Sequence, residues 1–358
     1  MGEEKILLVA FVTSFIIVLL STPALIKVAD LKRLYDEPGE PRKQHKVNIP
    51  AIGGIIIFAA TLFSFSLWLP TDKGVAVGLV SSDLKYIVST LLILFFIGIK
   101  DDIVGTAPVK KLMGHILVGL ILVLMANIKL TSMHGIFGIR EIPEWAGIFL
   151  SLFTYIVVVN AFNLIDGVDG LASGIGLIAC LAFGLWFFLV GDYINACLAF
   201  SLGGSLLAFL VFNFPPAKIF MGDSGALVIG LIMSILAIRL IEFPKEQLPE
   251  MLKGISKPIY ALAVLAFPLF DTLRIFIRRT IKGESPFAPD NKHLHHRMLK
   301  IGLTHTQTTL LFYLFNILVI CLAVGLKDVK PSLSLLIVGG VVVVLGQIPF
   351  FIKKKNGK

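Results

Sequence analysis

The sequence predicts an all-α polytopic membrane protein with about eleven transmembrane helices. Hydrophobic residues make up 56% of the 358 residues and charged residues only 15%, against about 25% charged residues in soluble domains. The apolar residues occur in runs whose lengths approach the roughly 20 residues that cross a bilayer. Such runs are expected to be helical, because lipid offers no water to bond the backbone.

We expect one integral membrane domain, residues 1–358, without a separate soluble domain. The first apolar run follows the acidic Glu3 and Glu4 and is too long for a signal-peptide core, so we do not expect it to be cleaved. All cysteines fall inside predicted spans, so neither a disulfide framework nor a cysteine zinc site is expected. The predicted spans are 5–29, 49–69, 84–99, 112–127, 146–162, 171–190, 193–212, 225–241, 258–274, 308–326 and 332–352.

The basic residues predict the orientation of these spans. The loops that follow the odd-numbered spans, counted with the C-terminal tail, contain about twice as many lysine and arginine residues as the N-terminus and the loops that follow the even-numbered spans. Such residues favour the cytoplasm. We therefore expect an outside N-terminus and a cytoplasmic C-terminus, and we attribute the net charge of +9 to topology rather than to nucleic-acid binding. The loops expected in the cytoplasm are 30–48, 100–111, 163–170, 213–224 and 274–307, together with the tail from 353.

Acidic side chains gather at the cytoplasmic ends of the predicted spans. Asp101 and Asp102 are adjacent carboxylates that repel each other near lipid unless a cation or proton offsets them. A magnesium ion or an incoming basic group would do so, although a solvated helix end beside Lys100 explains the pair equally well. Lys110 and Lys111 follow in the same loop, either as phosphate contacts or as membrane anchors.

The stretch Asn160–Gly170 places Asn160, Asn163, Asp166 and Asp169 at three-residue spacing within an apolar run. Oxygen ligands of this kind suit hard cations such as magnesium or manganese, whereas a polar turn would not need two amides buried before it.

Asp223, in Met221-Gly222-Asp223, begins the eighth span. It fits a helix N-cap or a carboxylate that binds magnesium together with a substrate phosphate.

A histidine-rich segment, His293-Leu294-His295-His296-Arg297, lies in the longest basic loop. Three histidines are also typical of a zinc site, but Lys292 and Arg297 would repel a cation, so we favour anion binding. A basic loop that touches anionic lipid is the simpler alternative.

The first cytoplasmic loop ends in the element His45-x4-Pro50-x-x-Gly53-Gly54. Positive-inside charge explains its basic residues, but not Gly53 and Gly54, which permit close backbone approach or helix packing. Arg239, Asp271 and His115 also lie within apolar runs, and we assign them no role.

Together these motifs resemble those of the polyprenyl-phosphate N-acetylhexosamine-1-phosphate transferase family. The resemblance rests on five elements in order: His45–Gly54, Asp101-Asp102, Asn160–Gly170, Met221-Gly222-Asp223 and His293-Leu294-His295-His296. It implies transfer of a sugar 1-phosphate from a UDP-N-acetylhexosamine to a polyprenyl phosphate, undecaprenyl phosphate in bacteria, with release of UMP. It also implies Mg²⁺ or Mn²⁺ as cofactor and a location in the bacterial cytoplasmic membrane with the site facing the cytoplasm; a homodimer is also compatible with it.

The resemblance also implies residue roles. Asp223 and Asn163 would hold the metal, and Asp101 or Asp102 would deprotonate or position the acceptor phosphate. The implied substrate-binding residues are Lys46 and Lys111 near the diphosphate, Asp166, Asp169 near the nucleotide, and His293, His295, His296 and Arg297 at the sugar-phosphate end of the donor.

One departure narrows the substrate. The branch that uses UDP-MurNAc-pentapeptide for peptidoglycan typically has His-x-His-His-His, whereas Arg297 follows His296 here. The sequence therefore resembles the branch that uses UDP-GlcNAc or a related sugar to begin cell-envelope glycans such as lipopolysaccharide O-antigen or teichoic acid linkers. The peptidoglycan reaction is the alternative within the family.

Two other classes of protein remain as alternatives. An ion-coupled secondary transporter also places acids within its helices, but near the bilayer midplane and often within internal repeats, neither of which this sequence shows. An assembly scaffold would not need ionisable acids on one face. For the enzyme we expect direct attack by the lipid phosphate rather than a covalent aspartyl intermediate.

Overall fold

The computed structural model describes residues 2–32, 35–36, 49–70, 77–283 and 294–351, and these are almost entirely helical. A short antiparallel pair, β1 (Tyr35–Asp36) with β2 (Ile49–Pro50), joins the first two helices. The helices are α1 (Glu3–Lys32), α2 (Gly54–Leu67), α3 (Val77–Val104), α4 (Pro108–Leu120) continued by the π-helix η1 (Ile121–Met125), the short η2 (Ile136–Gly138), α5 (Glu144–Ile165), α6 (Leu171–Leu189), α7 (Tyr193–Asn213), α8 (Gly222–Glu242), the short η3 (Lys245–Gln247), α9 (Lys257–Val264), α10 (Ala266–Ile281), α11 (Leu294–Ile301), α12 (His305–Gly325) and α13 (Pro331–Phe351).

The predicted class, an all-α polytopic membrane protein, is confirmed. Among the described residues, eight helices are long and apolar enough to cross a membrane, namely α1, α4 with η1, α5, α6, α7, α8, α12 and α13. The pair α9 and α10 adds a ninth if the two form one broken span. Helix α2 is apolar but has only 14 residues, and α3 covers the run predicted at 84–99. The total of eleven spans stays a prediction.

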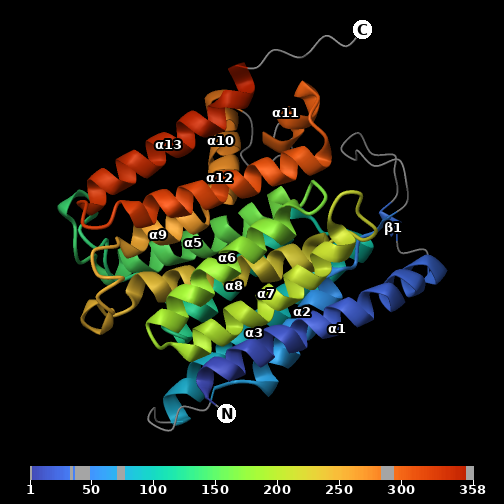
Figure 1. The fold of residues 1–358 in the computed structure, drawn as a ribbon, viewed down its shortest axis with the longest axis horizontal. Coiled ribbons are helices and arrows are strands. Elements are labelled where there is room, and N and C mark those ends of the chain that lie inside the picture. The colour runs from blue at the N-terminus through green and yellow to red at the C-terminus, as the bar shows by residue number, and fades with distance from the viewer. Residues whose placement is uncertain (1, 33–34, 37–48, 71–76, 284–293, 352–358) are drawn as a thin grey trace.

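Helix α8 forms the centre of the bundle. In its most apolar stretch 89% of the residues are buried, more than in any other of the eight spans. Helices α3 and α5 pack directly on α8, while α1 packs on α7 and α7 on α6. Figure 1 shows α1 along one edge and α13 along the other, with α6, α7 and α8 between them. Helix α8 is therefore held on more than one side by neighbouring helices.

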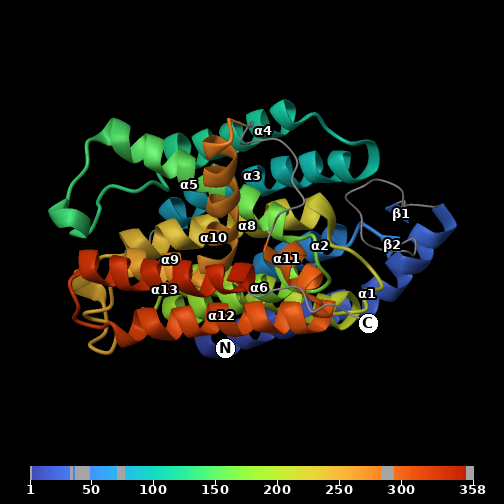
Figure 2. The same cartoon turned by 90° about the horizontal axis from the view of Figure 1, so that it is seen from above.

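The predicted span at 258–274 is not one straight helix. It breaks at Leu265 into α9 and α10, which are bent by 78° relative to each other. Pro268, in the first turn of α10, has no N–H to continue the hydrogen-bond ladder of α9. The buried Asn316 of α12 satisfies the groups freed by the break: its Nδ2 donates to the carbonyl of Val264, and its Oδ1 accepts from the N–H of Phe267. As a result α10 leaves the direction of its neighbours in both views (Figures 1 and 2).

Candidate active site

Four of the predicted polar side chains meet where α3, α4, α5 and α8 come together. The ammonium of Lys111 lies between three of them: it is paired with a carboxylate oxygen of Asp223, and it lies 3.4 Å from Asp101 Oδ2 and 3.5 Å from Asn163 Oδ1. Asn163 Nδ2 donates to Asp223 Oδ1 at 2.7 Å. We call Asp101, Lys111, Asn163 and Asp223 the acidic cluster. Sequence motifs more than 100 residues apart thus form one site.

Asp102 serves a different purpose from its neighbour Asp101. Its Oδ1 accepts from the backbone N–H of Asp223 at 2.7 Å, and its Oδ2 accepts from the N–H of Ser224 at 3.0 Å. A carboxylate at this point satisfies two of the backbone N–H groups that every helix leaves unpaired at its N-terminus. Asp102 therefore holds the first turn of α8, and with it Asp223, in place.

The glycine pair of the first loop fits tightly against the start of α8. The N–H groups of Gly53 and Gly54 donate to the carbonyls of Phe220 and Met221, at 3.0 and 2.8 Å. A Cβ on Gly54 would lie 2.1 Å from the backbone nitrogen of Gly225, so no larger residue fits without moving α8. This confirms the predicted close backbone approach at these glycines.

Asp166, in the loop between α5 and α6, extends the acidic cluster. Its carboxyl accepts from the backbone N–H of Gly222 and lies near Asp102 and Asp169. Loss of hydration, reinforced by the negative charges of Asp102 and Asp169, raises the pKa of Asp166 well above its ordinary value. A nearby positive charge would therefore stabilise the ionised form of Asp166.

Asp169 lies further along the same loop. Its Oδ2 accepts from the N–H of Ala217 at 3.0 Å, and its backbone carbonyl accepts from Thr309 of α12 at 3.0 Å. The buried Asn213 joins this loop to the one between α7 and α8, because it accepts from the N–H of Gly170 and donates to the carbonyl of Ile219. Asn213 was not predicted; an amide at the end of a buried apolar run was its only sequence signal.

The histidine-rich segment is described in part. Lys46 and His293 lie outside the described residues, as do the side chains of His295 and His296 on α11. Arg297 lies against α13, where its Nε donates to the carbonyl of Pro349 at 3.2 Å. This bond ties Arg297 to the C-terminal part of α13.

Asp271 of α10, to which the sequence assigned no role, orients α11. Its side chain is fully buried, and its Oδ1 accepts from the N–H of Leu294, the first residue of α11, at 2.8 Å. The start of α11 is therefore tied to the bent α10.

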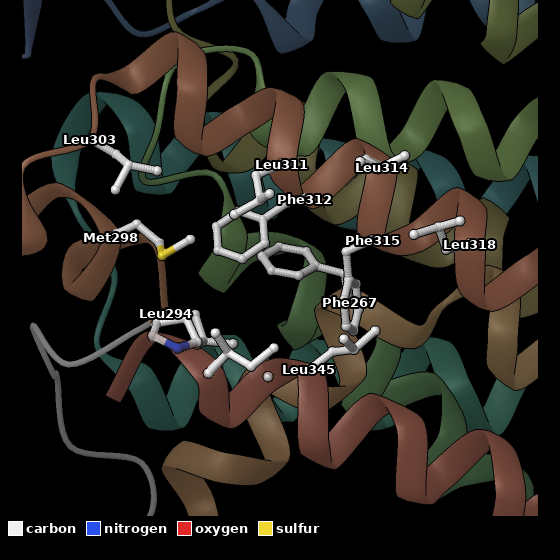
Figure 3. Close-up of a pocket in the computed structure, with 13 residues that line it drawn as sticks. Phe267, Leu294, Met298, Leu303, Leu311, Phe312, Leu314, Phe315, Leu318 and Leu345 are labelled. Atoms are coloured by element: carbon white, nitrogen blue, oxygen red, sulfur yellow. The ribbon is translucent and has the colours of Figure 1, made fainter. Parts of the chain in front are cut away.

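An apolar pocket of about 270 Å³ lies between α10, α11, α12 and α13. Figure 3 shows Met298 and Leu303 at one end, Leu318 at the other, and Phe267, Phe312 and Phe315 between them. Because Leu294 and Met298 of α11 line it, the pocket adjoins the histidine-rich segment.

The acidic cluster has the chemistry of a hard-cation site. Among the described residues no group of three His, Cys, Asp or Glu side chains is arranged to hold a metal. Magnesium, however, needs only one or two carboxylates and takes its remaining ligands from water and substrate phosphates. The Lys111 ammonium already lies among oxygens of Asp101, Asn163 and Asp223, so these oxygens are placed to surround a positive charge. The residues present fit Mg²⁺ or Mn²⁺.

The chain is similar to known proteins. Residues 84–241, which contain the whole acidic cluster, match glycosyl transferase family 4. The chain is 29% identical to the probable undecaprenyl-phosphate N-acetylglucosaminyl 1-phosphate transferase of Bacillus subtilis over 94% of this chain and 90% of that protein. It is 30% identical to the undecaprenyl-phosphate alpha-N-acetylglucosaminyl 1-phosphate transferase of Escherichia coli K12 (80% and 75%). It is 32% identical to the decaprenyl-phosphate N-acetylglucosaminephosphotransferase of Mycolicibacterium smegmatis (85% and 78%).

The chain belongs to glycosyl transferase family 4. The resemblance inferred from the five motifs is confirmed, and these relatives are named as N-acetylglucosamine-1-phosphate transferases.

Proposed function

We propose that this protein transfers N-acetylglucosamine 1-phosphate from UDP-GlcNAc to undecaprenyl phosphate and releases UMP, as the first membrane step of a cell-envelope glycan. The observation that carries the proposal is the meeting of Asp101, Lys111, Asn163 and Asp223 in one cluster, within a chain whose relatives are named for this transfer. The excess of basic residues in the same set of loops supports a cytoplasmic position for the cluster.

In this reaction an oxygen of the lipid phosphate attacks the phosphorus that carries the sugar. The bond from that phosphorus to the bridging oxygen breaks, and UMP leaves with the electron pair. Such transfers depend mainly on positioning and on neutralising charge. Lys111 would contact the diphosphate oxygens, and Asp101 would position the acceptor phosphate or accept its proton.

We further propose that Asp223 and Asn163 hold a Mg²⁺ or Mn²⁺ ion. When bound, the ion would neutralise the charge that develops on the UMP leaving group. In the structure Asp102 uses both carboxylate oxygens to bond the backbone of α8, so a role as nucleophile would require it to release the helix. This argues against a covalent intermediate on Asp102, and we propose direct attack by the lipid phosphate.

The test is UMP release by the purified protein with undecaprenyl phosphate, magnesium and UDP-GlcNAc, with UDP-MurNAc-pentapeptide in parallel. Turnover with UDP-GlcNAc alone is expected. Turnover with the pentapeptide donor alone would move the protein to the peptidoglycan branch. No turnover with either donor, combined with gradient-driven flux of a solute in proteoliposomes, would replace the enzyme by a transporter.

A further inference from the structure

His305, the first residue of α12, lies beside Asp169. Its Nδ1 is 3.9 Å from Asp169 Oδ1 and is buried without a hydrogen-bond partner among the described residues. The side chain as a whole is nevertheless 39% exposed. The ring therefore turns one nitrogen inward toward a carboxylate and its other edge outward. A buried polar nitrogen without a partner costs free energy, so this arrangement calls for an explanation.

The position of His305 is fixed by the fold. Two side chains further along α12 bind the loop that carries Asp169: Thr309 donates to the carbonyl of Asp169 at 3.0 Å, and Tyr313 donates to the carbonyl of Gly170. A capping box between Thr304 and Gln307 fixes the first turn of α12. The proximity of His305 to Asp169 is thus set by three further contacts and does not depend only on the rotamer of the His305 side chain.

A chain of contacts leads from the acidic cluster to His305. Asp102 bonds the start of α8, Asp166 bonds Gly222 and lies near Asp102 and Asp169, and Asp169 faces His305. These polar side chains form a row that begins at Lys111 and ends at His305. A UDP-sugar is an elongated molecule. With its diphosphate at Lys111 and Asp223, its nucleoside would extend toward Asp169 and His305.

We propose that His305 is a further donor-binding residue that contacts the nucleoside of the UDP-sugar through its outward ring edge. This inference rests on the proposed function. A proton on Nδ1 donated to Asp169 leaves Nε2 as an acceptor for an N–H or O–H group of the nucleoside. Asp169 then orients the ring, as a carboxylate behind a histidine commonly does. Closing the 3.9 Å separation when the donor binds would give the buried Nδ1 its missing partner.

The experiment compares His305→Ala, His305→Asn and His305→Gln with the wild-type protein. The readouts are kcat, KM for UDP-GlcNAc, KM for undecaprenyl phosphate, and the Kd of UMP by titration calorimetry, which requires no acceptor. His134→Asn is the matched control, because His134 interacts with Glu242 at the other end of α8 and Asn tolerates its positive φ. We expect this control to match the wild type.

His305→Ala is expected to raise KM for UDP-GlcNAc and the Kd of UMP about tenfold, the effect of losing one hydrogen bond, while KM for the lipid stays unchanged. Gln can place its amide where Nε2 lies and should recover part of the UMP affinity. Asn reaches only the Nδ1 position and should not.

Four results would overturn the inference. Unchanged UMP affinity in His305→Ala would show that the ring does not contact the nucleotide. Full recovery by Asn, or equal rises in both KM values, would reduce His305 to a residue that positions α12. Wild-type protein that neither binds UMP nor turns over would reject the proposed function itself, and this inference with it.

Discussion

Asp102 of α3 accepts a hydrogen bond from the backbone N–H of Asp223 at 2.7 Å, while its second oxygen accepts from the N–H of Ser224 at 3.0 Å. The carboxylate therefore caps a helix to which it does not belong. The side chain of Asp223 points from that same turn to Asn163 and Lys111. Two adjacent aspartates thus divide the work: Asp101 faces the cluster, and Asp102 holds the helix that supplies Asp223.

These two roles predict that Asp101→Asn and Asp102→Asn affect turnover and thermal stability differently. An asparagine at 102 keeps one acceptor and turns its NH₂ toward a backbone N–H, so it loses a charge-assisted hydrogen bond of about 1.5–3 kcal/mol. We expect Asp102→Asn to lower both the turnover, about 100-fold or more, and the melting temperature in detergent. Asp101→Asn should lower turnover with little thermal change. A fully stable but inactive Asp102→Asn protein would instead assign Asp102 a chemical role.

Gly54→Ala is expected to abolish UMP release. The added Cβ would lie 2.1 Å from the backbone nitrogen of Gly225 and 2.4 Å from Ser224 Oγ, so either α2 or the first turn of α8 must move. Gly340→Ala is the matched control, because no atom lies within 4 Å of its added Cβ and alanine favours helix. Wild-type turnover in Gly54→Ala would show that the start of α8 can shift without cost to the site.

Much of this site could be predicted from the sequence, because an acid or amide at the end of an apolar run conflicts with its surroundings wherever the chain folds. That conflict identifies Asp101, Asn163 and Asp223, and a Gly-Gly pair at a helix mouth signals close packing.

Other features depend on partners that local pattern does not reveal. Two neighbouring aspartates look alike until α8 is placed against one of them. Pro268, just after the break at Leu265, is visible in the sequence, but the break is stabilised by Asn316 on another helix. His305 becomes a candidate binding residue only once the fold places it beside Asp169, which is far away in the chain.

The apolar pocket predicts an effect that depends on the length of the acceptor lipid. A tryptophan at Leu345, which lines the pocket, would fill space that we expect part of the polyprenyl chain to occupy. Leu345→Trp should raise KM for undecaprenyl phosphate but leave KM for a short polyprenyl phosphate of two isoprene units unchanged. Val343→Trp is the control, since Val343 is exposed on the same helix outside the pocket. Equal effects on both acceptors would place the lipid chain elsewhere.

Lys111→Met should make the protein more dependent on divalent cations for its stability. The ammonium now lies among oxygens of Asp101, Asn163 and Asp223, and without it the two carboxylates repel each other. We expect a lower melting temperature in chelator and a larger rise on addition of MgCl₂ than in the wild type, because a ligand that binds the folded state stabilises it. Turnover should be low even with MgCl₂ present, since the diphosphate loses its lysine contact.

Lys110→Met is the matched control, because Lys110 is exposed one residue away and should behave as the wild type. An Mg²⁺-induced shift equal to that of the wild type would mean that the metal and the ammonium do not share these oxygens, and Asp223 and Asn163 would then lose their assignment as ligands.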